Sequence, residues 1–127
     1  MKPRILIADD ASFVREILKT IVVRQGWIVI GEAQDGLEVI SMATELEPNI
    51  ILMDIVMPKL NGLEAAQKIL KKLPDIAIIG LSTMDNEEIM SQALGIGLVS
   101  YITKPFENWT IIAAIKEALN NKERKSG

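Results

Sequence analysis

Residues 50–58 read Ile-Ile-Leu-Met-Asp-Ile-Val-Met-Pro, an apolar run interrupted only by the carboxylate of Asp54. The apolar residues before Asp54 are typical of a short strand that is buried on both faces, and Pro58 predicts a loop after it. Burying an ion is costly unless the charge is compensated, so packing alone does not explain a carboxylate at this point. We therefore expect Asp54 to lie where a strand opens into a reactive crevice.

Similar short apolar stretches recur along the chain, and amphipathic segments separate them. This alternation predicts an α/β fold with parallel strands and right-handed crossovers. The expected strands cover residues 4–8, 27–33, 49–53, 76–81 and 98–103, and the expected helices cover residues 12–25, 37–47, 62–72, 86–94 and 108–121.

The helix ends and buried helix faces can also be predicted. Ser12 is expected to cap the first helix, and Gly26 is expected to end it. Apolar spacing predicts buried faces made of Leu37, Ile40, Ala43 and Leu46 in the second helix and of Ile89, Ala93 and Leu94 in the fourth.

Length and composition limit the class of protein. A chain of 127 residues with 49% hydrophobic residues predicts one domain, here residues 1–121, followed by a polar, frayed tail at 122–127. The net charge of −3 gives no reason to expect nucleic-acid binding. No apolar run approaches the roughly 20 residues that span a bilayer, and the N-terminal run is too short for a signal peptide, so we expect a cytoplasmic protein without membrane insertion.

Polar side chains stand at the ends of four predicted strands. Asp9 and Asp10 follow the first, Asp54 the third, Ser82 the fourth and Lys104 the fifth. If the strands are parallel, all five side chains meet at one edge of the sheet, where ligands bind in open α/β sheets. Each alone has an ordinary explanation, such as a solvated turn or a helix cap, and only their joint placement indicates a site.

The residue types at this edge predict a particular chemistry. Because the chain has no histidine and no cysteine, a metal here would be held by oxygen, which favours Mg²⁺, with Mn²⁺ as a substitute. Lys104 and Ser82 could bind phosphoryl oxygens. The site therefore looks suited to a phosphoryl group on or near Asp54.

The same segments carry a family resemblance. Residues 5–10 (Ile-Leu-Ile-Ala-Asp-Asp), 53–58 (Met-Asp-Ile-Val-Met-Pro) with Gly62, 81–82 (Leu-Ser) and 101–106 (Tyr-Ile-Thr-Lys-Pro-Phe) resemble response-regulator receiver domains, especially the CheY-like single-domain chemotaxis receivers. The likeness extends over about residues 4–120. It implies a flavodoxin-like (βα)5 doubly wound sheet of five parallel strands in the order 2-1-3-4-5.

The resemblance also implies roles for the residues of the site. Asp54 would accept a phosphoryl group from a phosphohistidine of a sensor histidine kinase. Asp10 and Asp54 would bind Mg²⁺ directly, together with the backbone carbonyl of Val56, and Asp9 would bind it mainly through water. Lys104 would pair with the phosphoryl group.

A change of partner binding would follow phosphorylation. Ser82 would move towards the phosphoryl group, and Tyr101 would turn inward into the vacated space. The surface of residues 86–121 would change and control a protein target such as the flagellar motor switch. The resemblance implies a signalling protein, monomeric or dimerising on phosphorylation, that catalyses only its own phosphorylation and dephosphorylation and does not bind nucleic acid directly.

Several positions depart from the family's usual pattern. Thr83 and Leu98 stand where a small alanine is common. Val56 and Met84 are both apolar, at positions where the family is variable. We hypothesise that they hinder the water that attacks the phosphoryl group, and so prolong the phosphorylated state. Trp109 either lies on the partner-binding surface or covers the edge of the core.

Other functions remain open at this stage. The chain could be a receiver cut from a longer response regulator with an output domain. An aspartyl-phosphate phosphatase of the haloacid dehalogenase type would need a second aspartate two residues after Asp54, where Val56 stands. A flavin carrier on the same fold would need a phosphate-binding loop where Asp9 and Asp10 would instead repel the flavin phosphate.

Overall fold

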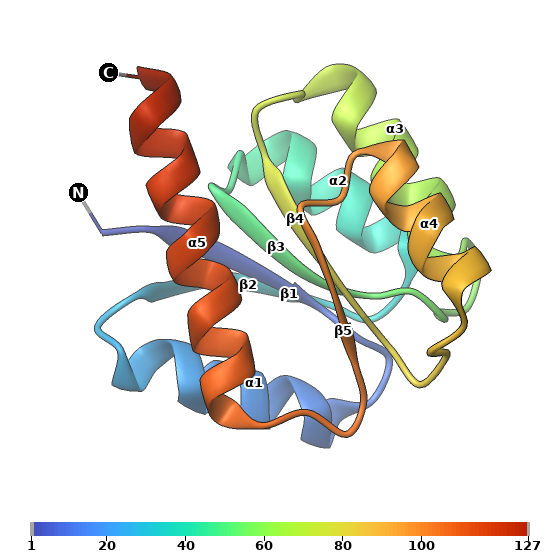
Figure 1. Cartoon of the computed structure of the whole chain (residues 1–127), viewed down its shortest axis with the longest axis horizontal. Coiled ribbons are helices and arrows are strands. Elements are labelled where there is room, and N and C mark those ends of the chain that lie inside the picture. Colours follow the sequence, from blue (N-terminus) through green and yellow to red (C-terminus); the bar gives the residue numbers. More distant parts are fainter. Residues whose placement is uncertain (1, 127) are drawn as a thin grey trace.

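Five parallel strands alternate with five helices along the chain (Figure 1). The computed structural model describes residues 2–126, with side chains as far as Lys122. The strands pair in the order β2-β1-β3-β4-β5, so the predicted fold class and strand order are confirmed. The strands are β1 (Arg4–Ala8), β2 (Ile28–Ala33), β3 (Ile50–Asp54), β4 (Ala77–Ser82) and β5 (Ser100–Thr103); the helices are α1 (Ser12–Arg24), α2 (Gly36–Leu46), α3 (Gly62–Lys72), α4 (Glu87–Ile96) and α5 (Asn108–Ser126).

The sheet is the middle of three layers. Helices α1 and α5 cover one face, and α2, α3 and α4 cover the other (Figure 1). Side chains alternate between the two faces along each strand. In β1, for example, Ile5 and Ile7 pack with α1 and α5, whereas Leu6 and Ala8 pack with the other three helices. This double burial explains why the strands are apolar almost throughout.

Two strands extend one residue further than predicted. Asp54 is the last residue of β3 and Ser82 is the last residue of β4. The sequence had predicted that each would be the first residue after its strand. The ladder continues past both positions, because the Ile55 N–H donates to the Leu81 carbonyl at 2.9 Å and the Lys104 N–H to the Ser82 carbonyl at 2.7 Å. A polar side chain does not end a strand whose backbone groups still have partners.

The predicted buried face of α2 was wrong at its first residue. Leu37 is 56% exposed, whereas Gly36, Val39 and Ala43 are buried against the sheet side. Contact with the next loop sets this rotation, since a Cβ at Gly36 would lie only 2.0 Å from the Leu60 carbonyl oxygen. The prediction for α4 was also wrong at Leu94, which is exposed, while its neighbour Ala93 is buried.

Two helix ends differ from the predictions, and the end of α1 at Gly26 agrees with them. Ser12 does not cap α1: it is the first helical residue, and the N-cap is Ala11, without a side-chain cap. Gly26 has φ +83°, as a residue that ends a helix often does. Helix α5 continues to Ser126, beyond the predicted end near residue 121, and Gly127 lies outside the described residues. Within residues 2–126, no helix combines the length and the apolar character needed to cross a membrane.

Candidate functional site

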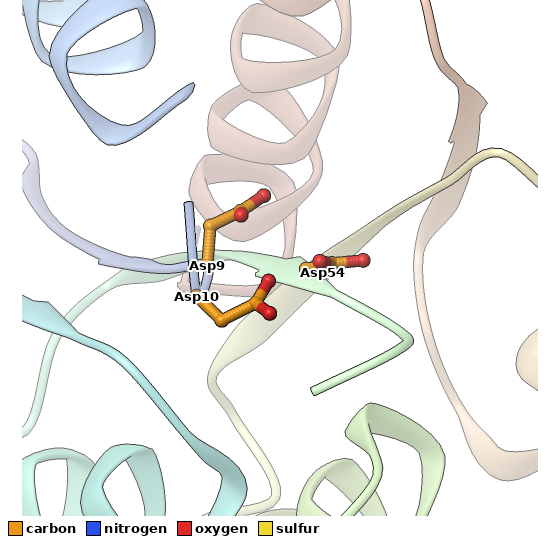
Figure 2. A group of neighbouring side chains, drawn as sticks. All are labelled: Asp9, Asp10 and Asp54. Atoms are coloured by element: carbon orange, nitrogen blue, oxygen red, sulfur yellow. The ribbon is translucent and has the colours of Figure 1, made fainter. Parts of the chain in front are cut away.

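The carboxyl ends of β1, β3, β4 and β5 bring the five predicted side chains to one edge of the sheet. Asp54 ends β3 and Ser82 ends β4, while Asp9 follows β1 and Lys104 follows β5. Figure 2 shows the carboxylates of Asp9, Asp10 and Asp54 converging from two neighbouring strands. The juxtaposition predicted from the sequence is therefore present.

Asp54 is a buried carboxylate with few partners. The residue is 6% exposed, and its Oδ1 accepts a hydrogen bond from the Val56 N–H at 3.1 Å. Its Oδ2 lies 3.5 Å from the Lys104 Nζ. Burial, together with the nearby charge of Asp9, raises the pKa of Asp54 to about 6, although Lys104 and the Val56 N–H lower it. Asp54 is thus ionised at neutral pH, but its charge is poorly stabilised.

Lys104 is paired more closely with Asp9 than with Asp54. Its Nζ lies 2.8 Å from Asp9 Oδ2, and Asp9 Oδ1 accepts from the Ala11 N–H at 2.9 Å. Burial works against the charge of Lys104, but the hydrogen bond of Asp9 and the charges of both carboxylates outweigh it, so the pKa of Lys104 lies above its ordinary value. Asp9 is fully buried, whereas Asp10 is exposed at the mouth of the site.

The three carboxylates fit a hard divalent cation. Asp9, Asp10 and Asp54 can each offer one oxygen such that all three oxygens lie within 4.8 Å of one another. Lys104 supplies one positive charge against three negative ones. Oxygen donors in this number are those that Mg²⁺ and Mn²⁺ take in proteins, usually with waters or a phosphate completing the set.

Ser82 and Tyr101 are linked through the backbone of Met84. The fully buried Ser82 Oγ accepts from the Met84 N–H at 3.0 Å. The Tyr101 hydroxyl donates to the Met84 carbonyl, and its half-buried ring packs against the core on the α2–α4 side. The sequence placed both residues near the site, but did not reveal that one peptide segment joins them.

The positions that depart from the family's usual pattern have different surroundings. Val56 and Met84 are 51% and 43% exposed, and they lie in the loops that follow β3 and β4. Leu98 is buried and fits because residue 80 is glycine: a Cβ there would lie 2.8 Å from Leu98 Cδ2. Trp109 is 68% exposed and, with Tyr101, lines a shallow depression beside β5. It therefore does not serve mainly to cover the core.

Two glycines allow close packing of the loop that follows β3. The Gly62 N–H donates to the Ile55 carbonyl at 2.7 Å, and a Cβ at Gly62 would lie 2.4 Å from the Asp54 carbonyl oxygen. Gly36 packs equally closely against Leu60 in the same loop. The need for a residue without a side chain at these two positions becomes visible only when the segments meet.

A polar network behind Asp9 was not foreseen. The Arg15 guanidinium donates to the Asp9 backbone carbonyl at 2.7 Å and pairs with Glu32 at 3.3 Å, and Lys19 pairs with the same glutamate at 3.1 Å. One signal was available in the sequence. Glu32 is a charged residue inside the apolar run 27–33, and a charge in such a run needs a partner.

Comparison with known proteins identifies the family. Residues 5–116 match the response regulator receiver domain, and the chain belongs to that family. The chemotaxis protein CheY of Thermotoga maritima is 38% identical over 117 residues, which cover 92% of this chain and 98% of that protein. The protein-glutamate methylesterase/protein-glutamine glutaminase of the same organism is 44% identical over 104 residues, which are 80% of this chain but 30% of that protein.

The fold agrees with solved receiver structures. The CheY-like response regulator receiver domain protein of Methanospirillum hungatei superposes with a TM-score of 0.92 at 27% identity, covering 98% of this chain and 99% of that one. The chain is therefore a receiver domain of two-component signalling, similar to chemotaxis receivers.

Proposed function

We propose that Asp54 accepts a phosphoryl group from a phosphohistidine of a sensor histidine kinase, in a reaction that needs Mg²⁺. The observation that carries the proposal is the buried Asp54 carboxylate, which lies beside both a lysine and two further carboxylates. The matched receiver family and the similarity to chemotaxis receivers support the same assignment.

The transfer is a simple displacement at phosphorus. An oxygen of ionised Asp54 attacks the phosphorus, the P–N bond breaks, and the imidazole nitrogen leaves with the electron pair and takes a proton from solvent. A divalent cation held by Asp9, Asp10 and Asp54, with the Val56 carbonyl as a further predicted ligand, would neutralise charge on the phosphoryl oxygens. Lys104 is close enough to Asp54 to pair with another of these oxygens once the group is attached.

The proposed response begins at Ser82. Its hydroxyl now holds the Met84 N–H, and a move towards a phosphoryl oxygen would break that bond. Met84 also holds the Tyr101 hydroxyl, so Tyr101 would lose its present partner and turn inward. The surface formed by α4, β5 and α5 would then change shape and affinity for a protein target. By analogy with the chemotaxis relatives, that target belongs to a chemotaxis system, and the flagellar motor switch is one candidate.

A phosphorylation assay tests the proposal. The protein is incubated with Mg²⁺ and a small phosphodonor such as acetyl phosphate, and the intact mass is measured. We expect one phosphoryl group per chain that is labile to hydroxylamine, absent in Asp54→Asn and retained in Asp75→Asn, an exposed aspartate between α3 and β4. Labelling of the Asp54→Asn variant would refute the assignment. Sustained turnover of phosphate esters by the wild type would favour the phosphatase alternative.

A receiver module of a longer regulator is the second candidate. It is favoured by the 44% identity to the methylesterase, of which this chain matches less than a third. The chemistry at Asp54 would be the same, but the surface of α4, β5 and α5 would contact an attached output domain instead of a separate protein.

A further inference from the structure

The structure points to Arg15 as a positioning residue for the divalent-cation site, and we infer that Arg15, held by Glu32, fixes the Asp9–Asp10 turn in its binding geometry. The inference rests on the proposed Mg²⁺ dependence of the site. It concerns residues outside the acidic cluster: Arg15 and Lys19 lie on α1, and Glu32 lies on the edge strand β2.

Asp9 is held on both sides of its backbone. Its N–H donates to the Ala33 carbonyl at 3.0 Å, and its carbonyl accepts from Arg15 Nη1 at 2.7 Å. The pairing of β1 ends at Ala8, so the Asp9 carbonyl lies beyond the last residue of the strand. Arg15 thus gives a donor to a carbonyl that the sheet does not hold.

The position of Asp10 depends on the orientation of this carbonyl. The peptide group between Asp9 and Asp10 is planar, so fixing the Asp9 carbonyl also fixes the nitrogen and Cα of Asp10. Asp10 is the exposed member of the cluster. Within residues 2–126, its carboxylate takes part in no hydrogen bond or ion pair. Without the Arg15 bond, rotation of this peptide group would therefore move the Asp10 carboxylate away from Asp9 and Asp54 at little cost.

Arg15 is itself held in place. Its side chain is only 13% exposed, and its Nε lies 3.3 Å from a Glu32 oxygen. The guanidinium presents several donors in one plane, so it can bind a carboxylate and a carbonyl at the same time. Glu32 also accepts from Lys19 at 3.1 Å, but no bond of Lys19 reaches the turn. Lys19 therefore provides the control position, because it places a positive charge beside the same glutamate but does not contact Asp9.

Charge and geometry make opposite predictions for Arg15→Gln. Removing a positive charge near a cation site should strengthen Mg²⁺ binding if Arg15 acts through charge alone. If Arg15 instead holds the turn, removing its donor should weaken Mg²⁺ binding by about tenfold, as is typical for partners that orient metal ligands. Arg15→Lys separates the two effects further, because it keeps the charge but not the planar pair of donors.

The experiment measures Mg²⁺ affinity by calorimetric titration of the whole protein, with Mn²⁺ titration by electron paramagnetic resonance as a second readout. We expect Arg15→Gln, Arg15→Lys and Glu32→Gln each to weaken binding by about tenfold. Lys19→Gln should stay within about twofold of the wild type. Urea unfolding in EDTA checks that the variants are folded, and Glu32→Gln and Arg15→Lys carry the test if Arg15→Gln does not fold.

The outcomes are distinguishable from failure of the proposed function. If the wild type binds Mg²⁺ and the Arg15 and Glu32 variants bind it equally well or more tightly, the positioning role is wrong while the metal site stands. If Lys19→Gln weakens binding as much as Arg15→Gln, the bond from Arg15 to the Asp9 carbonyl is not what sets the affinity, and the inference is also wrong. If the wild type binds no divalent cation, both the inference and the proposed Mg²⁺ dependence are overturned.

Discussion

Replacing Asp54 by asparagine should stabilise the metal-free protein, and more so at higher pH. The folded state holds the Asp54 proton with a pKa of about 6, compared with the ordinary value of 3.8. Between these values the unfolded chain has released the proton while the folded chain still binds it. Stability is therefore lost as the pH rises through this window, and the loss is complete above the folded pKa.

The size of the effect follows from the shift. A difference of about two pKa units corresponds to about 3 kcal/mol at pH 7.5, and the same relation gives about 1 kcal/mol at pH 4.5. Asparagine keeps the shape and can still accept from the Val56 N–H, although its amide is a poorer neighbour for Lys104 than a carboxylate. We therefore expect a net gain of about 1–3 kcal/mol at pH 7.5 that shrinks by about 2 kcal/mol at pH 4.5.

Urea unfolding in EDTA at several pH values measures this gain. Wild type and Asp54→Asn are compared at each pH, so that the titration of other groups cancels in the difference. The exposed Asp75→Asn serves as a control for the loss of a carboxylate at the surface. An Asp54→Asn variant that is no more stable at pH 7.5, or whose advantage is the same at both pH values, would show that burial of Asp54 is not destabilising.

Three other outcomes are expected. Gly62→Ala should lower the free energy of unfolding, measured in urea, by about 3 kcal/mol, because its Cβ would lie 2.4 Å from the Asp54 carbonyl oxygen. Gly95→Ala on α4 is the control: its Cβ would meet open space, so its effect should be neutral or slightly stabilising. Equal effects of the two substitutions would contradict this. Val56→Asn and Met84→Glu should speed loss of the phosphoryl group, followed by intact mass, if apolar side chains hinder water; faster loss in neither variant would refute the idea. Mg²⁺ should raise the melting temperature more at pH 7.5 than at pH 5, where Asp54 is largely protonated. An equal rise at both pH values would refute the link between ionisation of Asp54 and Mg²⁺ binding.

The general position of the site could be read from the sequence without knowing the order of the strands. Parallel strands place their carboxyl ends at one edge whatever their order, so Asp9, Asp54, Ser82 and Lys104 had to gather there once the strands were recognised. The order 2-1-3-4-5 came from the family resemblance, because apolar runs of similar length do not specify which strands are neighbours.

The wrong predictions were all made from local sequence patterns, without the contacts that the folded chain adds. Leu37 was assigned to the buried face of α2 from spacing alone, but spacing does not fix how a helix is rotated when apolar residues cover much of its surface. The close approach of Gly36 to Leu60 decides that rotation. Asp54 and Ser82 were placed after their strands because they are polar, although the backbone ladder continues through them.

The sequence by itself determined the alternation of strands and helices, the edge at which the functional side chains meet and their chemical types, because these depend on periodicity and chain direction. Only the tertiary structure decided that Lys104 pairs more closely with Asp9, 95 residues away, than with Asp54, and that Arg15 reaches behind the acidic turn. The physical reason is distance. A hydrogen bond is made or lost within about an ångström, and such separations between remote segments are set by the packing of helices on both faces of the sheet.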